Sequence, residues 1–403
     1  MTRIERKLFD LIRNNIFIIL FVCISVISVL LRIYGLKFPS DDYRRYLNSW
    51  WIVISNQGID GLSKQVGNYN IPYQIIIFIL TRLKMDSLFA YKIISLFFDY
   101  VLAVSAALLV KQIRGEKFFS FSPIVTYSMI LCSLTVIFNS AFWGQCDTIY
   151  VSFILLAIYF INKEKNIPAF ILLGAAFAFK LQMIFILPLF LYYYATTRKC
   201  SILHFLLIPL TDIVLCLPAL FCGRPFLDIF KIYVGQTDEG KQLQMNFPNI
   251  YAFFTDGNKR APYDLLRDFT IVFAIAVLLG GLTLLLYKKV DLSNRENLIL
   301  TGIWSVFTCL MFLSSMHERY GYILDILVIV YAIAYRKHYV VAILCNLISL
   351  RGYGFYLFEN YEAFTIGQAS MIYLGLYFYV TYLFVRETAL GKKEPLRLMH
   401  VRN

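Results

Sequence analysis

The sequence predicts an all-α fold, a polytopic membrane helix bundle, and three observations lead to this fold class. Of the 403 residues, 59% are hydrophobic and only 16% are charged, and the mean hydropathy is +0.66. Soluble domains of this length do not expose so much apolar surface, so lipid is the expected solvent. The aromatic content of 17% is typical of a protein with two interfacial belts. We therefore expect a single integral membrane domain over residues 1–403.

Long apolar runs predict about twelve membrane crossings. The runs occupy residues 14–34, 88–110, 119–138, 147–161, 167–179, 181–195, 202–222, 269–287, 297–315, 320–335, 338–350 and 368–385. Several are shorter than the roughly 20 residues of a straight span, which is tolerated inside a bundle or beside a water-filled cavity. A further short run, 71–83, is expected to be re-entrant or to pack at the outer interface.

The distribution of charge predicts the orientation of the bundle. The net charge of +13 is assigned to loop lysines and arginines that face an anionic leaflet, and no nucleic acid partner is expected. Basic segments that predict cytoplasmic loops and termini lie at 1–7, 111–117, 162–165, 196–199, 287–295, 335–338 and 391–397. The unusual polar and aromatic segments then fall on the outer side, where loops 35–70 and 223–268 are expected to complete a site.

The segment 39–51, PSDDYRRYLNSWW, places two carboxylates, Asp41 and Asp42, after the first apolar run. An apolar stripe at helical spacing follows them, formed by Tyr43, Leu47, Trp50, Trp51 and Ile54. The stripe predicts an amphipathic helix on the membrane surface, with both carboxylates at headgroup height. There a carboxylate can take a proton from an acceptor hydroxyl. The alternative interpretation is a solvated helix cap.

Three further groups of polar residues border apolar runs. Trp143, Gln145 and Asp147 offer hydrogen bonds to a sugar hydroxyl or to basic neighbours, or else form a helix cap. Lys180 lies so deep that it must be paired or meet a phosphate, and the alternative to phosphate is an ion pair with Asp147 or Asp99. Asp99, inside a span, also needs a partner, and a structural ion pair is the favoured explanation.

The segment MHERY places His317, Glu318 and Arg319 between two apolar runs. Arg319 is suited to a lipid phosphate because its guanidinium can donate two parallel hydrogen bonds. Glu318 is expected to orient Arg319 or Lys180. No second ligand pair has the spacing of a metal site, so no metal ligand is predicted, although a divalent cation is left open.

Four motifs in one order resemble the GT-C superfamily of polyprenyl-phosphate-sugar-dependent glycosyltransferases, in particular its bacterial mannosyltransferase-like members. SDDYRRYLNSWW with GNYNIPYQ is similar to the family's acidic-Tyr…Trp…Asn-Tyr-x-x-Pro-Tyr pattern. NSAFWGQCDTIY resembles its Trp-Gly-Gln-x-Asp step, AFAFKLQMIFILPLFL its Lys-x-Gln…Pro helix pair, and MHERY its His-Glu-Arg-Tyr step. The motifs extend over residues 40–320. Leu181 stands where proline is usual, and Ile71-Pro72 replaces a proline pair.

The resemblance implies an inverting transfer of a mannose- or glucose-like hexosyl residue from a polyprenyl-monophosphate sugar to an acceptor hydroxyl on the outer face. Asp42 aligns with the catalytic base, and Asp41 is a neighbour that raises the proton affinity of the pair. We expect Lys180, His317, Arg319 and Arg351 to bind the donor phosphate. The expected substrate-binding residues are Tyr43, Tyr69, Tyr73, Trp143, Gln145, Asp147, Gln182, Glu318 and Asn246. No cofactor is expected.

The implied partners are the lipid-linked donor, a glycan or lipid-linked acceptor, and membrane lipids, in a bacterial plasma membrane. Two other functions stay open. A transporter or flippase for a lipid-linked oligosaccharide would place charges at mid-membrane depth, for which Asp99 and Asp212 are the candidates. An O-antigen-type ligase or polymerase would use outer-face Arg and His and would lack the Asp42 motif.

Overall fold

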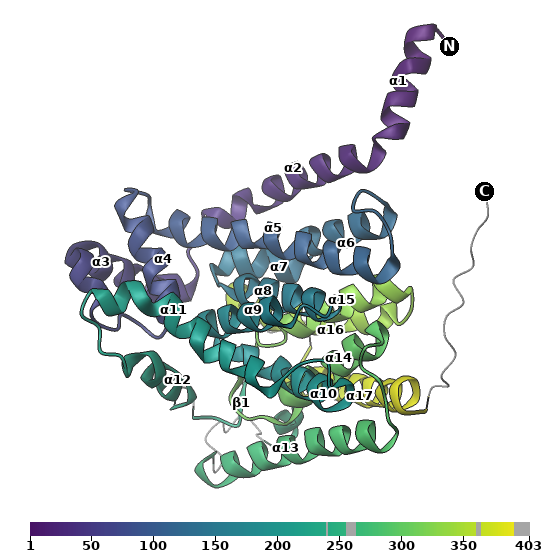
Figure 1. The fold of residues 1–403 in the computed structure, drawn as a ribbon. Coiled ribbons are helices and arrows are strands. Elements are labelled where there is room, and N and C mark those ends of the chain that lie inside the picture. Colours follow the sequence, from purple (N-terminus) through teal and green to yellow (C-terminus); the bar gives the residue numbers. More distant parts are fainter. Residues whose placement is uncertain (239–240, 255–262, 360–363, 391–403) are drawn as a thin grey trace.

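The computed structural model describes residues 1–238, 241–254, 263–359 and 364–390, and in these residues the chain is an all-α bundle with one small strand pair (Figure 1). The α-helices are α1 (Arg3–Asn14), α2 (Ile16–Leu36), α3 (Asn48–Gln57), α4 (Ile71–Arg82), α5 (Ser87–Arg114), α6 (Phe121–Cys132), α7 (Leu134–Ile137), α8 (Asp147–Ile161), α9 (Asn166–Phe179), α10 (Leu187–Thr197), α11 (Leu207–Phe221), α12 (Asp228–Asp238), α13 (Tyr263–Tyr287), α14 (Arg295–Phe312), α15 (Tyr322–Tyr335), α16 (Tyr339–Phe358) and α17 (Ile366–Leu383). Short π and 3₁₀ turns include η1 (Tyr43–Leu47), η3 (Phe138–Trp143) and η4 (Leu181–Ile186).

Six helices in the described residues are long and apolar enough to cross a membrane, by length and composition. They are α2, α5, Ile202–Phe221 with α11, Leu265–Tyr287 within α13, α16, and Ile366–Thr388 with α17. A seventh results if α6 and Leu134–Trp143, bent by 46°, are one broken span. The fold class is thus confirmed as an all-α bundle with the apolar helices of a membrane protein. The twelve crossings expected from the sequence remain a prediction.

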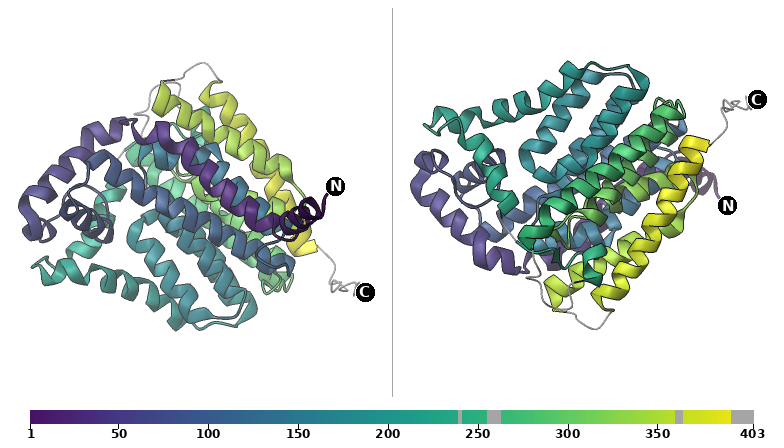
Figure 2. Two further views of the ribbon diagram at one scale, coloured as in Figure 1. Left: turned by 90° about the horizontal axis from the view of Figure 1, so that it is seen from above. Right: turned by 90° about the horizontal axis from the view of Figure 1, so that it is seen from below.

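The helices differ in how deeply they are buried. Most side chains of α8, α14 and α15 are buried, so these three helices form the centre of the bundle. By contrast, α2 buries only Ser28, Arg32 and Gly35. Figure 2 and Figure 1 together show α2 on one side of the bundle and α13 on the opposite side. The outward apolar faces of these peripheral helices are those that lipid would cover.

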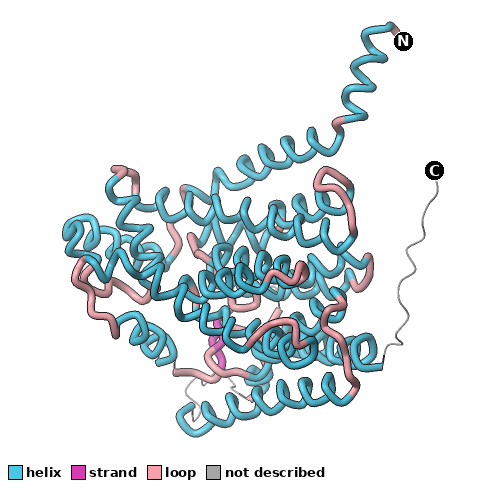
Figure 3. The backbone as a smooth tube through the Cα atoms, viewed as in Figure 1, coloured by secondary structure: helices cyan, strands magenta, loops and turns pink. Residues whose placement is uncertain are grey.

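The loops that were expected to form a site converge at one end of the bundle. There α3 and α12 lie away from α1, which is at the other end (Figure 1). Strand β1 (Gln244–Met245) pairs in parallel with β2 (Met316–His317), which joins the loop before α13 to the loop between α14 and α15 (Figure 3). Parts of loop 223–268 (239–240 and 255–262) and the basic segment 391–397 lie outside the described residues.

Two local predictions can be compared with the structure. The predicted amphipathic segment is helical as η1 and α3, and three residues of its stripe, Leu47, Trp51 and Ile54, are buried against α4 and α5, while its placement on a membrane surface remains a prediction. The predicted apolar run 338–350 is only part of a longer helix, because α16 continues to Phe358. The predicted run ends at residue 350, before the charged Arg351, but the helical spacing of buried residues continues through Tyr353 and Leu357.

Candidate functional site

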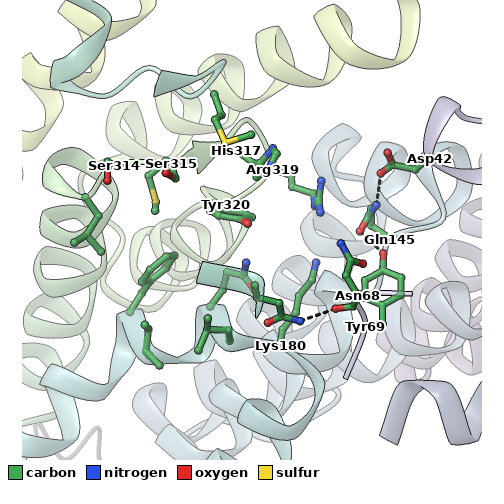
Figure 4. A pocket seen from close by; sticks show the side chains of 18 of the residues that line it. Asp42, Asn68, Tyr69, Gln145, Lys180, Ser314, Ser315, His317, Arg319 and Tyr320 are labelled. Carbon is green, nitrogen blue, oxygen red and sulfur yellow. Dashed lines mark hydrogen bonds between the residues drawn. The ribbon is translucent and has the colours of Figure 1, made fainter. Parts of the chain in front are cut away.

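A cavity of about 820 Å³ lies between α3, α12 and the loop that follows α14. This volume is in the range of ligand sites in proteins. Its polar lining includes Asp42, Arg45, Asn68, Tyr69, Gln145, Lys180, Gln182, Gln236, Arg267, Ser314, Ser315, His317, Arg319, Tyr320 and Tyr356. In the close view of Figure 4, Asp42, Gln145 and Tyr69 occupy one side and Ser314 and Ser315 the other. Arg319 and Lys180 lie between these two sides (Figure 4).

Asp42 has a hydrogen-bond donor for each of its carboxylate oxygens. The indole Nε1 of Trp143 and the amide Nε2 of Gln145 each donate to Oδ2 at 2.7 Å. The hydroxyl of Tyr356 donates to Oδ1 at 2.5 Å. Since these donors come from η3, from the turn before α8 and from α16, three separate elements fix the orientation of one carboxylate at the cavity wall.

The donors to Asp42 are themselves held in place by packing and by backbone conformation. Trp143 stacks on Tyr356 with ring centroids 4.1 Å apart and an angle of 12° between the planes. Gly144 has φ of +76°, a left-handed conformation that favours glycine and lets the chain turn between η3 and α8. Gln145 accepts a hydrogen bond of 2.8 Å from the Tyr69 hydroxyl. Desolvation raises the pKa of Tyr69, so this hydroxyl stays protonated and able to donate.

A buried lysine anchors the segment that leads into Asp42. Lys92 of α5 is 1% exposed, and its Nζ donates to the carbonyl oxygens of Gly35 and Phe38 at the end of α2. Ser40 then donates to the carbonyl oxygen of Trp143 at 2.8 Å. These contacts fix the exit of α2 against η3 directly before Asp42.

The basic side of the cavity is organised around Asp147. Lys180 lies at the break between α9 and η4, where its backbone is extended. Its Nζ is 2.5 Å from Oδ1 of Asp147, and Nε of Arg319 is 3.8 Å from Oδ2. Asn139 also donates to Oδ2 at 2.9 Å. The ion pair of Lys180 with Asp147, which the sequence left as an alternative to phosphate binding, is therefore present.

Arg319 is the second cation beside Asp147. Its guanidinium carbon lies 5.3 Å from the centre of the Trp143 ring. Burial alone would lower the pKa of Arg319, but the carboxylates of Asp147 and Asp42 raise it, so the side chain stays charged. Its Nε is buried and has no hydrogen-bond partner among the described residues. One carboxylate is thus shared by two cations that line the cavity.

The structure brings seven of the predicted site residues together on the cavity wall. These are Asp42, Tyr69, Gln145, Lys180, Gln182, His317 and Arg319. Trp143 and Asp147 do not line the cavity, but each contacts a residue that does. The backbone of His317 belongs to β2, and its Nδ1 is 3.8 Å from Oε2 of the neighbouring Glu318.

The remaining predicted residues do not line the cavity. Asp41 turns outward to an exposed pair with Arg45 at 3.1 Å. Tyr43 shares a hydrogen bond of 2.6 Å with Ser87. Four more lie in different surroundings: Tyr73 is buried against Tyr69, Glu318 is buried beside Gly352, Arg351 donates to the carbonyl oxygen of Phe364, and Asn246 forms a backbone bridge with His317.

Sequence reasoning missed several residues of the cavity, namely Arg45, Asn68, Gln236, Arg267 and Tyr356. Tyr356 follows Asp42 by 314 positions, so no local pattern joins them. The only local indication was that the helical spacing of apolar residues continues through RGYGFYLF, which places Tyr356 on the same helix as the preceding run. In the described residues, no group of three or more His, Cys, Asp and Glu side chains is placed to hold a metal ion.

The chain matches no protein-family model and no curated protein sequence, so membership of the family that its motifs resemble remains a prediction.

Proposed function

We propose that this protein is a membrane glycosyltransferase of the GT-C type, which moves a hexosyl residue from a polyprenyl-monophosphate sugar to an acceptor hydroxyl. The observation that carries the proposal is that Asp42 lines the same cavity as Lys180 and Arg319. Substitution at an anomeric carbon needs a base for the incoming hydroxyl and positive charge for the departing phosphate. Both requirements are met by residues around one ligand-sized space.

In the proposed reaction, the acceptor oxygen attacks the anomeric carbon and its proton passes to the Asp42 carboxylate. The new carbon–oxygen bond forms on the face opposite the phosphate, so the configuration inverts. As the bond from the anomeric carbon to the phosphate oxygen breaks, the lipid phosphate gains one negative charge. Lys180 and Arg319 stabilise that charge, and Asp147 holds both cations in position before the donor arrives.

The wall near Asp42 has the composition of an acceptor site for a glycan. It presents the aromatic rings of Tyr46 and Trp50 together with the amides of Asn68 and Gln236. Aromatic faces pack against the C–H groups of a sugar ring, while amides exchange hydrogen bonds with its hydroxyls. The ring of Trp50 rests on Gly67, where a Cβ would come within 2.3 Å of it.

Other parts of the cavity wall are apolar and suit a lipid chain. Ile184, Phe185, Ile271 and Leu313 line the cavity there. Ile271 belongs to α13, a peripheral helix with a largely exposed apolar surface. We propose that the donor enters from the bilayer on this side, that the cavity faces the outer surface of a bacterial plasma membrane, and that the bundle crosses it about twelve times.

The test is Asp42→Asn in the purified full-length protein. With undecaprenyl-phosphate mannose and undecaprenyl-phosphate glucose as donors and an oligosaccharide acceptor, sugar transfer should fall by about 10²–10⁴-fold. Thermal unfolding should change little. Asp41→Asn is the matched control, since its side chain is exposed and does not line the cavity.

Normal transfer by Asp42→Asn would remove the proposed base. Absence of transfer by the unmodified protein from both donors would remove the proposed function itself. A flippase that uses the same cations for passage would instead move the donor lipid between leaflets in liposomes, with or without Asp42.

A further inference from the structure

The first helix of the chain, α1, has an apolar face that no described part of the protein covers. None of its 12 residues is buried, although it begins with a complete capping box between Thr2 and Glu5. Its apolar side chains have these exposed fractions: Ile4 80%, Leu8 53%, Phe9 60%, Leu11 60% and Ile12 40%. A helix this short is marginal in water by itself, so its stability requires a surface that buries this face.

The opposite face of α1 is predominantly basic. Arg3, Arg6, Lys7 and Arg13 project from it together with Asp10, while the other acid of the helix, Glu5, belongs to the capping box. At 100° per residue, these side chains lie outside the apolar arc of Ile4, Leu8, Leu11 and Ile12. The helix therefore combines a narrow apolar face with a cationic polar face, the pattern of helices that lie in the headgroup layer of an anionic membrane.

The position of α1 in the fold also supports a location at the membrane surface. Asn15 interrupts the helical path between α1 and α2, and α2 is one of the helices long and apolar enough to cross a membrane. In Figure 1, α1 runs across the direction shared by α2, α5 and α13, and in the left view of Figure 2 it is seen almost end-on. A helix perpendicular to spanning helices lies in the plane of the bilayer.

We propose that α1 docks on the headgroup layer at the N-terminal end of α2, with its apolar face in the bilayer and anionic lipids around its basic residues. A second copy of the chain is a poorer occupant, because joining two such faces would bring their basic side chains together. The inference does not depend on the proposed glycosyl transfer, since no residue of α1 lines the cavity.

The experiment uses the full-length protein in lipid nanodiscs, with the exposed cysteines Cys23 and Cys132 and the half-buried Cys222 replaced by serine. Spin labels are attached in turn to Leu8→Cys and, on the opposite face, Arg6→Cys. In nanodiscs of phosphatidylglycerol and phosphatidylethanolamine, the Leu8 label should be relaxed by oxygen and protected from a water-soluble nickel chelate. The Arg6 label should show the reverse.

A charge control keeps the apolar face and removes the cations. With Arg3→Gln, Lys7→Gln and Arg13→Gln, protection of the Leu8 label should fall at least twofold in the anionic nanodiscs, to the level found in phosphatidylcholine. Equal access of the nickel chelate to both labels in anionic nanodiscs would overturn the proposal. So would dipolar broadening between Leu8 labels of two copies, which would identify another chain as the occupant.

Discussion

Two buried acid–base pairs of this protein have the same chemistry but very different surroundings. Arg32 of α2 meets Asp99 of α5 at 2.9 Å, and both side chains are fully buried. Lys180 meets Asp147 at 2.5 Å, and this pair borders the cavity. The first pair joins α2 to α5, whereas the second joins the start of α8 to the end of the next helix, α9. Only the second pair is in reach of a ligand.

The first pair is enclosed by the protein, although Nη2 of Arg32 and Oδ1 of Asp99 have no hydrogen-bond partner among the described residues. Arg32 also donates to the side chain of Ser28 and to the carbonyl oxygen of Leu131, while Asp99 accepts from Ser140. It thereby joins α2, which is otherwise hardly buried, to α5, α6 and η3. The structural ion pair expected for Asp99 is thus confirmed. Around Asp147 a second cation, Arg319, leaves positive charge at the cavity wall. Whether a buried ion pair has a structural role or belongs to a ligand-binding site therefore depends more on its surroundings than on its residue types.

The largest effect is expected when the closed pair is broken. Arg32→Met should lower the free energy of unfolding by about 3–5 kcal/mol, because it leaves a buried carboxylate without its cation. Adding Asp99→Leu should restore most of that loss, since the double variant buries no charge. Chemical unfolding in detergent measures both. A double variant as unstable as Arg32→Met would show that the pair's charges are not the cause.

Breaking the open pair should affect turnover more than folding. Lys180→Met should reduce kcat/KM by about 10²–10³-fold, equivalent to roughly 2.7–4 kcal/mol of transition-state stabilisation. Its stability should fall less than that of Arg32→Met, because Asp147 keeps Arg319 and Asn139 as partners. Equal loss of stability in both variants would make Lys180 a second structural anchor and would contradict the contrast.

Replacing Asp147 and replacing Asp99 should have different effects on the binding of an anion. Asp147→Asn leaves Lys180 and Arg319 without their shared counter-charge, so inorganic phosphate should bind about tenfold more tightly and raise the unfolding temperature further than in the unmodified protein. That change corresponds to about 1.4 kcal/mol. Asp99→Asn is the control and should gain nothing from phosphate. Thermal unfolding against phosphate concentration gives the comparison.

The smallest effect is expected for two adjacent tryptophans, one of which lines the cavity while the other is buried in the protein. Trp50 lines the cavity, whereas Trp51 is buried against Tyr91. Trp50→Leu should raise the KM for an oligosaccharide acceptor by about five- to tenfold, equivalent to roughly 1–1.4 kcal/mol, because one stacking surface is lost. Trp51→Leu should lower the unfolding temperature and leave this KM unchanged. A KM that rises equally in both variants would argue against an acceptor site at Trp50.

Much of this arrangement could be predicted from the sequence because it depends on short-range patterns. Apolar runs predict helices, and the stripe after Asp42 predicts η1 and α3. Charged residues between apolar runs pointed to Lys180 and Arg319, since charge is costly in a membrane. The resemblance of the ordered motifs led us to expect that Asp42, Lys180 and Arg319 share one site. In the structure, these three residues line the same cavity.

The sequence does not predict hydrogen-bond and ion-pair partners that only the packing of distant helices brings together. Arg32 sits in the first apolar run without any local sign of Asp99, 67 positions later. Tyr356 reaches Asp42 only because α16 packs beside η3. Asp41 and Asp42 are adjacent and chemically identical, yet Asp41 is exposed and pairs with Arg45, whereas Asp42 lines the cavity and accepts hydrogen bonds there.

The link between Arg32 and Asp99 also bears on how the chain enters the bilayer. During synthesis, α2 emerges before α5, so its arginine meets lipid before its counter-ion exists. An arginine inside an isolated span disfavours insertion by up to about 3 kcal/mol, less near a helix end. Arg32 lies in the last turns of α2, where its long side chain can reach the headgroups. We therefore expect α2 to reach its final depth in the bilayer only after α5 has been inserted and Asp99 can pair with Arg32. Membrane insertion of these two helices would then be cooperative.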